Sequence, residues 1–423
     1  MKSMIYRTKG ALGMPAAVVD FILFILVSQL MKPQGISVIS PSLQKILWPQ
    51  FGNEIAYIFI VAAGFLALSM RRKCDQAFLV ALCFPLVSGL LTVIRGLSVF
   101  GWLRNYSSAI IALLILQICK YDLIRLIRVL RVYLEILIII NLIYIILYPT
   151  GAYEGDVYSY YNWFLGYKSS LQCYMVPCIC LEWLDSCYSK KSIRFITMLF
   201  IGVTETILSH NAMLSMGMII LTLFIVFRLY ELKPLRSGYL YIVIVILVNV
   251  IFVFFIALLG KLSIFQALLD IFNKTMTLSS RASVIWPKTL QMIADNPVFG
   301  HGVYLAKSYD RIFGKAGFSH AHNQFLQVLL DGGVFLLVIF FGWLLYVCRR
   351  LGRNKDLRSS KIFVFFLFEI LLMATVEVYI FGPTYFATWL VLYLSMYTYD
   401  IDRQYRSALM NSSNLLNDQL RRE

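Results

Sequence analysis

Charged side chains are scarce in this sequence. Only 14% of its 423 residues are Asp, Glu, Lys or Arg, and 60% are hydrophobic. Soluble globular proteins carry roughly 25% charged residues, so this chain has too little polar surface to cover a fold in water. The shortage excludes a soluble domain and predicts an all-α polytopic membrane protein, with residues 1–423 in a single membrane domain.

Acidic residues are fewer than basic ones, and cysteines are absent from the predicted outer loops. The 22 acidic against 38 basic residues give a net charge of +16, which in a soluble protein would indicate nucleic-acid binding. Here the positions of the charges explain the excess, so we expect no nucleic-acid partner. The eight cysteines have spacings that indicate neither a disulfide framework nor a zinc site.

Twelve apolar runs follow one another along the chain. A helix needs about 20 apolar residues to cross the hydrocarbon core of a membrane. The predicted spans are 15–31, 54–70, 77–94, 106–119, 132–148, 171–188, 193–208, 212–230, 239–259, 324–348, 362–381 and 385–399. Ser209-His210-Asn211 is interpreted as a turn, because a span that included it would be too long for one crossing.

Positive charge sets the predicted orientation. With both termini cytoplasmic, 26 of the 38 Lys and Arg residues lie on the inner side, and the short outer loops hold only 5. The first run is followed by Lys32-Pro33-Gln34 rather than by a small-residue cleavage site, so we expect it to remain as an anchor. The other 7 basic residues lie in one long outer loop.

That loop, residues 260–323, is much longer than any other connection and is rich in apolar residues. These features predict a folded extracytoplasmic subdomain that carries the site. Ser279-Ser280 is expected to cap a helix from about Arg281 to Asp295, and Asn296-Pro297 is expected to end it.

Two side chains near this loop have the chemistry of an active site. All four histidines, at positions 210, 301, 320 and 322, are predicted to lie on the outer side. His322 begins the tenth span, where the helix N-terminus disfavours protonation of the ring, and a neutral imidazole is a competent base. Arg281 would lie in the first turn of the loop helix, a geometry suited to binding phosphate oxygens.

Three motifs occur in a fixed order: RASVIW from Arg281, NPVFGHG from Asn296 and HNQFLQVLLDGG from His322. This order resembles the O-antigen ligase and polymerase family, which comprises Wzy-type polysaccharide polymerases and lipopolysaccharide O-antigen ligases. The motifs span a short part of the chain. About twelve transmembrane helices with a long outer loop between the ninth and tenth, a GT-C-like arrangement, also look like the family.

The resemblance implies glycan transfer on the outer face of the bacterial cytoplasmic membrane. The donor would be an undecaprenyl-pyrophosphate-linked glycan, used without a nucleotide sugar, a metal or another cofactor. His322 would take the proton from the acceptor hydroxyl as that oxygen attacks the anomeric carbon with inversion. Arg281 would hold the pyrophosphate leaving group, which needs cationic stabilisation.

Further substrate-binding residues are expected from weaker matches. The segment WFLGYKSS from Trp163 looks like the family's Phe-Gly-x-Lys-Asn element, so Lys168 is expected to contact phosphate or to anchor in the headgroups. At Leu208-Ser209-His210-Asn211 the family's arginine is missing, and Arg95 or Arg104 is expected to replace it. Glu377 would orient Arg281 or bind sugar hydroxyls. The predicted substrate-binding residues are therefore Lys168, Arg104, Arg95, His320, Asn323, His210 and Glu377.

Three alternatives remain at this point. An O-antigen ligase would share the fold and the chemistry but would use lipid A-core as acceptor. A lipid-linked oligosaccharide transporter would show broken helices and an internal repeat. A prenyl-phosphate-sugar glycosyltransferase is disfavoured, because residues 32–53, its expected catalytic loop, contain no acidic residue. For the polymerase, membrane lipid and a chain-length regulator are the further partners expected.

Overall fold

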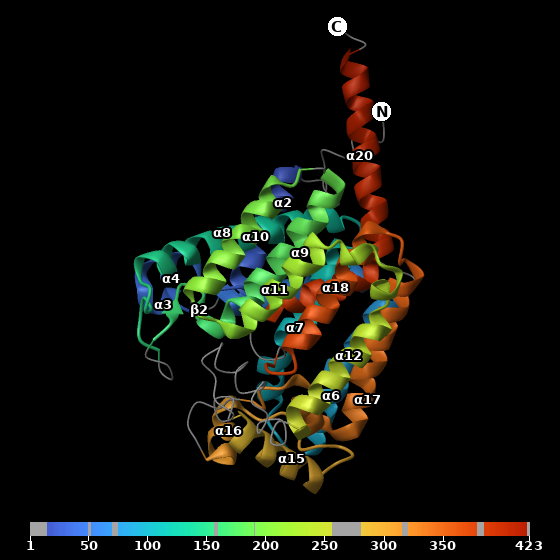
Figure 1. Cartoon of the computed structure of the whole chain (residues 1–423). Coiled ribbons are helices and arrows are strands. Elements are labelled where there is room, and N and C mark those ends of the chain that lie inside the picture. Colours follow the sequence, from blue (N-terminus) through green and yellow to red (C-terminus); the bar gives the residue numbers. More distant parts are fainter. Residues whose placement is uncertain are drawn as a thin grey trace.

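The computed structural model describes residues 15–49, 52–69, 75–155, 160–189, 191–255, 281–314, 320–378 and 385–420. Figure 1 shows them as a body of packed helices. The strands in these ranges form one short antiparallel hairpin, β1 (Asn162–Trp163) with β2 (Gly166–Tyr167). The predicted all-α class is therefore correct for the described residues apart from this hairpin.

Each predicted span contains a helix. The first nine contain α2 (Ala16–Leu30), α5 (Gly52–Ser69), α6 (Gln76–Ile94), α7 (Val99–Cys119), α8 (Leu123–Leu147), α9 (Gln172–Ser189), α10 (Ile193–Leu208), α11 (Ala212–Val226) and α12 (Gly238–Val250) with the π-helical η4 (Ile251–Phe255). The last three contain α17 (Gln324–Arg353), α18 (Arg358–Met373) and α19 (Phe386–Leu394), which continues through η7 (Ser395–Tyr397) into α20 (Thr398–Leu420). Between the spans lie α3 (Ile36–Ile39), α4 (Pro41–Leu47), η1 (Lys168–Ser170), η2 (Leu229–Glu231) and η3 (Lys233–Arg236).

The helices have the length and surface of a helical membrane protein. Among the described residues, α6, α7, α8 and α17 are long and apolar enough to cross a membrane, and shorter apolar helices lie within α2, α5, α11 and α12. Large apolar side chains such as Phe65, Phe200 and Phe227 are exposed on the outside of the bundle. An extended apolar surface of this kind suits contact with lipid. The count of twelve spans stays a prediction.

The core is centred on α9, which is buried along most of its length and packs against α8, α10, α18 and α19. Trp183 of α9 stacks on Phe195 and lies edge-on to Phe365 and Phe366. Arg131 of α8, which is buried in the same region, forms ion pairs with Glu182 and Asp185 of α9. Such pairing is what a low-dielectric interior requires.

The described part of the long loop is folded. The π-helical η5 (Arg281–Ile285) leads into α15 (Trp286–Asp295), which ends at Asn296 as expected, and α16 (Ala306–Phe313) follows. The helices enclose a small second core of Ile285, Trp286, Tyr309, Phe313, Ala321, Leu326 and Leu330. Residues 256–280, including the expected Ser279-Ser280 cap, and residues 315–319 lie outside the described residues. In Figure 1, α15 and α16 lie at one end of the body and α20 projects from the other.

A break in α17 joins this loop to the membrane bundle. Gly333 has φ +63° and ψ −163°, a conformation that only glycine adopts readily, and it interrupts the helix. The turn after α15 packs into the break, where Val334 N donates to Pro297 O and Phe335 N to Val298 O, at 2.8 and 3.0 Å. Two further bonds, His301 N to Leu330 O and Gly302 N to Asp331 O, are each 2.8 Å long. The second and third motifs are therefore paired to each other through their backbones.

Candidate active site

The start of α17 is fixed by Asn323. Its side-chain oxygen accepts hydrogen bonds from the backbone N–H groups of Phe325 and Leu326, both at 3.0 Å, as an N-cap. Its side-chain nitrogen donates to Thr375 O at 2.8 Å, and Gln324 N donates to Ala374 O at the same distance. Asn323 is fully buried and holds the start of α17 against the end of α18, and its predicted contact with substrate stays a prediction.

This junction brings four ionisable side chains together. Arg281 Nη2 lies 3.5 Å from His322 Nδ1 and 4.0 Å from Glu377 Oε2. Glu377 Oε1 lies 3.5 Å from His322 Nδ1 and 3.4 Å from His320 Nε2. Arg281 comes from η5, the histidines precede α17, and Glu377 follows α18. We call Arg281, His320, His322 and Glu377 the four-residue cluster.

The position of Glu377 differs from the sequence prediction. The eleventh span was expected to run to residue 381, but α18 ends at Met373 and Glu377 lies in the connection beyond it. The helix ends early because the carbonyl groups of Ala374 and Thr375 accept hydrogen bonds from Gln324 and Asn323. Glu377 is thereby turned towards the histidines.

Several residues that sequence reasoning did not assign hold the histidine segment in place. The Trp286 indole donates to Ala321 O at 3.2 Å, and Ala321 N donates to Gln327 Oε1 at 2.8 Å. Gln327 in turn donates to the Tyr309 hydroxyl and to Asp331, both at 2.7 Å. The only sequence signal for these contacts was that Trp286, Gln327 and Asp331 belong to the motifs.

His322 has an unusual backbone conformation. Its φ of +47° lies in the left-handed region, which residues other than glycine rarely adopt. Strain of this kind costs on the order of 1–3 kcal/mol and persists only where surrounding contacts impose it. The bonds on both sides of His322, through Ala321 and Asn323, impose it here. The conformation places its ring beside His320, with the two ring centres 4.1 Å apart.

The hydrogen bonds of His320 determine which of its nitrogens carries the proton. The backbone N–H of His322 donates to His320 Nδ1 at 3.1 Å, so Nδ1 is an acceptor. In the neutral ring the proton then lies on Nε2, the atom that faces Glu377. Burial, with help from the nearby His322 and Arg281, lowers the pKa of His320 to about 3, although Glu377 opposes the shift. His320 is therefore neutral near pH 7.

The two histidines and Glu377 could also be considered as metal ligands. One candidate ligand atom from each of the three residues lies within 4.8 Å of the other two. A histidine that binds a metal usually donates its second N–H to an acceptor. His320 has the opposite arrangement, because its Nδ1 accepts and its Nε2 proton faces the carboxylate. The hydrogen bonds therefore suit orientation of the carboxylate better than metal binding, and independence from metals stays a prediction.

Arg281 has unused hydrogen-bonding capacity. Its side chain is 24% exposed, yet its Nε atom is buried and has no hydrogen-bond partner among the residues that the structure describes. A buried donor of this kind is costly unless something pairs with it. The planar guanidinium fork matches the oxygens of a phosphate. Arg281 is therefore suited to bind an anionic group at the edge of the four-residue cluster.

The two arginines expected to replace the missing family arginine lie on the loop-facing ends of α6 and α7. Arg95 Nη2 donates to the Asn296 side chain at 3.1 Å, which supports the turn after α15. Arg104 lies in the first part of α7 and is exposed. Asn105, the next residue of α7, donates to Tyr304 O at 3.3 Å and so forms a second hydrogen bond to the loop. Arg95 thus braces the loop through one exposed hydrogen bond, and both arginines are accessible to a ligand.

Lys168 and His210, predicted from separate motifs, lie near the same aromatic ring. Lys168 Nζ lies 4.3 Å from the centre of the Tyr161 ring, and His210 meets the same ring edge-on at 6.2 Å. Asn211 connects the two segments by donating to Lys168 O at 2.5 Å. A cation and an aromatic surface so arranged suit a phosphate or a sugar.

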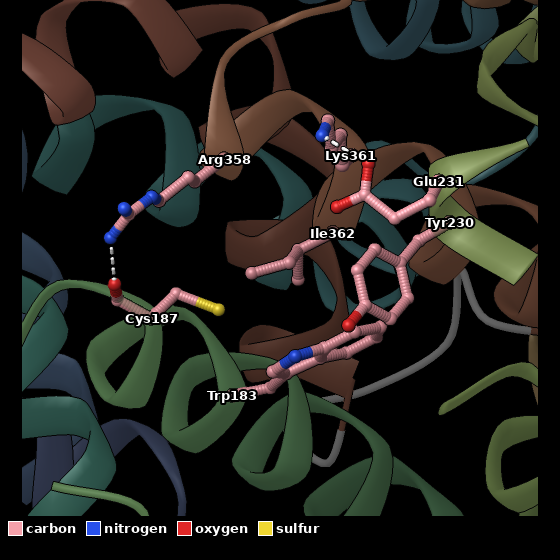
Figure 2. A pocket seen from close by; sticks show the side chains of 7 residues that line it. All are labelled: Trp183, Cys187, Tyr230, Glu231, Arg358, Lys361 and Ile362. Carbon is pink, nitrogen blue, oxygen red and sulfur yellow. Dashed lines mark hydrogen bonds and ion pairs between the residues drawn. The ribbon is translucent and has the colours of Figure 1, made fainter. Parts of the chain in front are cut away.

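A separate cavity lies between α9, η2 and α18 (Figure 2). Its volume is about 220 Å³, and its lining residues are Trp183, Cys187, Tyr230, Glu231, Arg358, Lys361 and Ile362. Both cations are engaged, Lys361 with Glu231 at 2.7 Å and Arg358 with the carbonyl of Cys187. None of the predicted site residues lines this cavity.

Comparison with known proteins supports the resemblance seen in the sequence. Residues 195–341, about a third of the chain, match a family model described as O-antigen ligase. The matched segment includes Arg281, His320 and His322 and ends before Glu377. No curated protein matches the chain. The resemblance to the O-antigen ligase and polymerase family is confirmed by this match.

Proposed function

From the O-antigen ligase match over residues 195–341, we propose that this chain is a polysaccharide polymerase. It transfers an undecaprenyl-pyrophosphate-linked glycan to a hydroxyl of a lipid-linked repeat unit, with inversion and without a metal. The reaction takes place at the outer face of the bacterial cytoplasmic membrane. The observation that carries this proposal is the approach of Arg281 and His322, 41 residues apart in the chain, to 3.5 Å.

The chemistry needs a base and a cation, and the four-residue cluster contains both. The acceptor oxygen forms a bond to the anomeric carbon as the bond from that carbon to the pyrophosphate oxygen breaks. The hydroxyl proton passes to His322, and the undecaprenyl pyrophosphate leaves with both electrons of the broken bond. A positioned base contributes about 10²–10⁴-fold to the rate.

Arg281 stabilises the departing pyrophosphate. Its buried Nε and its Nη groups form a fork for two phosphate oxygens, and charge-assisted bonds of this kind are the strong ones. Lys168, beside Tyr161 and His210, is a second cation for the phosphate or the adjoining sugar, and Arg104 is a third. These roles place the lipid-linked end of the donor near η5.

An O-antigen ligase is the second candidate, because the matching family model carries that description. The same base and cation would serve a lipid A-core hydroxyl. A transporter is less well supported. The break at Gly333 in α17 is a discontinuous helix, but the four backbone hydrogen bonds that fill it fix the break rather than leave it to move.

The test is reconstitution of the purified full-length protein in lipid nanodiscs. The donor and acceptor are lipid-linked repeats extracted from a strain that lacks this gene. A ladder of lengthening glycans is expected, also in the presence of a chelator, and transfer of single chains to lipid A-core would identify a ligase instead. His322→Ala and Arg281→Ala should abolish the ladder. Lys288→Ala, which removes an exposed cation of α15, is the matched control and should leave it unchanged.

A further inference from the structure

The geometry points to Glu377 as a positioning residue that sets the tautomer of His322, with His320 as the group that holds the carboxylate in place. This inference rests on the proposed function, in which His322 is the base. It assigns Glu377 a role through His322 rather than a contact with the sugar.

The carboxylate of Glu377 is held on several sides. It is 8% exposed, and its Oε1 atom accepts a hydrogen bond from the backbone N–H of Val378 at 3.1 Å. The same oxygen lies 3.4 Å from His320 Nε2, which carries the proton of that ring. Arg281 lies on the side of the other oxygen. A buried carboxylate with these neighbours is favoured in its ionised form.

His322 Nδ1 has two neighbours that favour opposite tautomers. Glu377 Oε1, at 3.5 Å, favours a proton on Nδ1, because a lone pair there would face a carboxylate oxygen. Arg281 Nη2, also at 3.5 Å, favours a lone pair on Nδ1, which would leave the proton on Nε2. Only the first tautomer gives Nε2 the lone pair with which it can accept a proton from a hydroxyl.

Binding of the donor resolves this competition. A diphosphate is a far stronger acceptor for a guanidinium than an imidazole nitrogen is, so Arg281 turns to the leaving group. Nδ1 of His322 is then left to Glu377, and their contact shortens as catalytic hydrogen bonds commonly do when substrate binds. The base therefore takes its active form only when the pyrophosphate is in place.

The neutral isostere Glu377→Gln tests the inference in the nanodisc assay. Its amide keeps the shape of the side chain but removes the charge, and it can donate to Nδ1 and so favour the inactive tautomer. We expect kcat to fall by about 10²–10⁴-fold, as for loss of the orienting carboxylate in a catalytic triad, with little change in KM. Glu369→Gln, which makes the same isosteric change at a buried side chain of α18 outside the four-residue cluster, is the matched control.

A double variant separates this role from a structural one. Because Glu377 acts through His322, Glu377→Gln should add no further loss in the His322→Gln background. Folding of each variant is checked by the stabilisation that inorganic pyrophosphate gives in a thermal melt. Wild-type kcat in Glu377→Gln, a loss confined to the KM of the acceptor, or additive losses in the double variant would each overturn the inference. Full activity of His322→Gln alone would instead refute the proposed function.

Discussion

Replacing Gly333 by alanine should separate the long loop that precedes α17 from the helical bundle. A Cβ atom at this position would lie 2.3 Å from the carbonyl carbon and oxygen of Val298, and the φ of +63° disfavours any side chain. Because both obstacles are backbone, the clash cannot be relieved by rotation of a side chain. The turn after α15 must move away from the break in α17.

The magnitude follows from the contacts that hold the turn. Four backbone hydrogen bonds join residues 297–302 to residues 330–335, and at about 0.5–1.5 kcal/mol each they contribute roughly 2–6 kcal/mol. Loss of about 3 kcal/mol of this raises the population of the undocked loop by about 100-fold. Arg281 moves together with the loop, so its alignment with His322 is lost as well.

Hydrogen–deuterium exchange measures the population of the undocked loop directly. The amides of His301, Gly302, Val334 and Phe335 should lose protection in Gly333→Ala, and glycan lengthening should fall with them. Gly342→Ala is the matched control in the same helix, since a Cβ there would meet nothing within 4 Å. That substitution should be neutral or stabilise by about 0.5–1 kcal/mol. Wild-type protection and activity in Gly333→Ala would refute the reasoning.

Three further predictions concern the four-residue cluster and its cap. Asn323→Ala should destabilise the protein by about 1–2 kcal/mol through loss of the N-cap and should reduce activity, as thermal melts and the lengthening assay will show, and unchanged stability would contradict this role. The pKa of His320 is about 3 when folded and about 6.5 when unfolded, so between these values the unfolded chain binds more protons. The free energy of unfolding should therefore fall as pH is lowered from 6.5 towards 3, by at most about 1.4 kcal/mol per pH unit, and an equally steep fall in His320→Gln would contradict the assignment. Inorganic pyrophosphate should raise the melting temperature of the wild type and not of Arg281→Ala, and equal protection of both would place the anion elsewhere.

The sequence alone indicated the membrane character and the helices, and its motifs predicted the two principal site residues. Apolar runs are local signals, and each predicted run contains a helix, because a run of about 20 apolar residues satisfies its backbone only as a helix in lipid. Arg281 and His322 were predicted to act together because they lie in short motifs, and the structure brings them to 3.5 Å from each other. The helix boundary at Asn296 was found because proline follows it.

Only the tertiary structure decided how distant residues pair. Glu377 was expected near a helix end, but the hydrogen bonds from Asn323 and Gln324 stop α18 early and turn the carboxylate to the histidines. Arg95, which is predicted to contact phosphate, also donates a hydrogen bond to Asn296 that the sequence did not indicate. These contacts join segments tens to hundreds of residues apart, and a hydrogen bond depends on the distance and angle at which packing leaves two groups. Composition and spacing along the chain carry no record of that geometry.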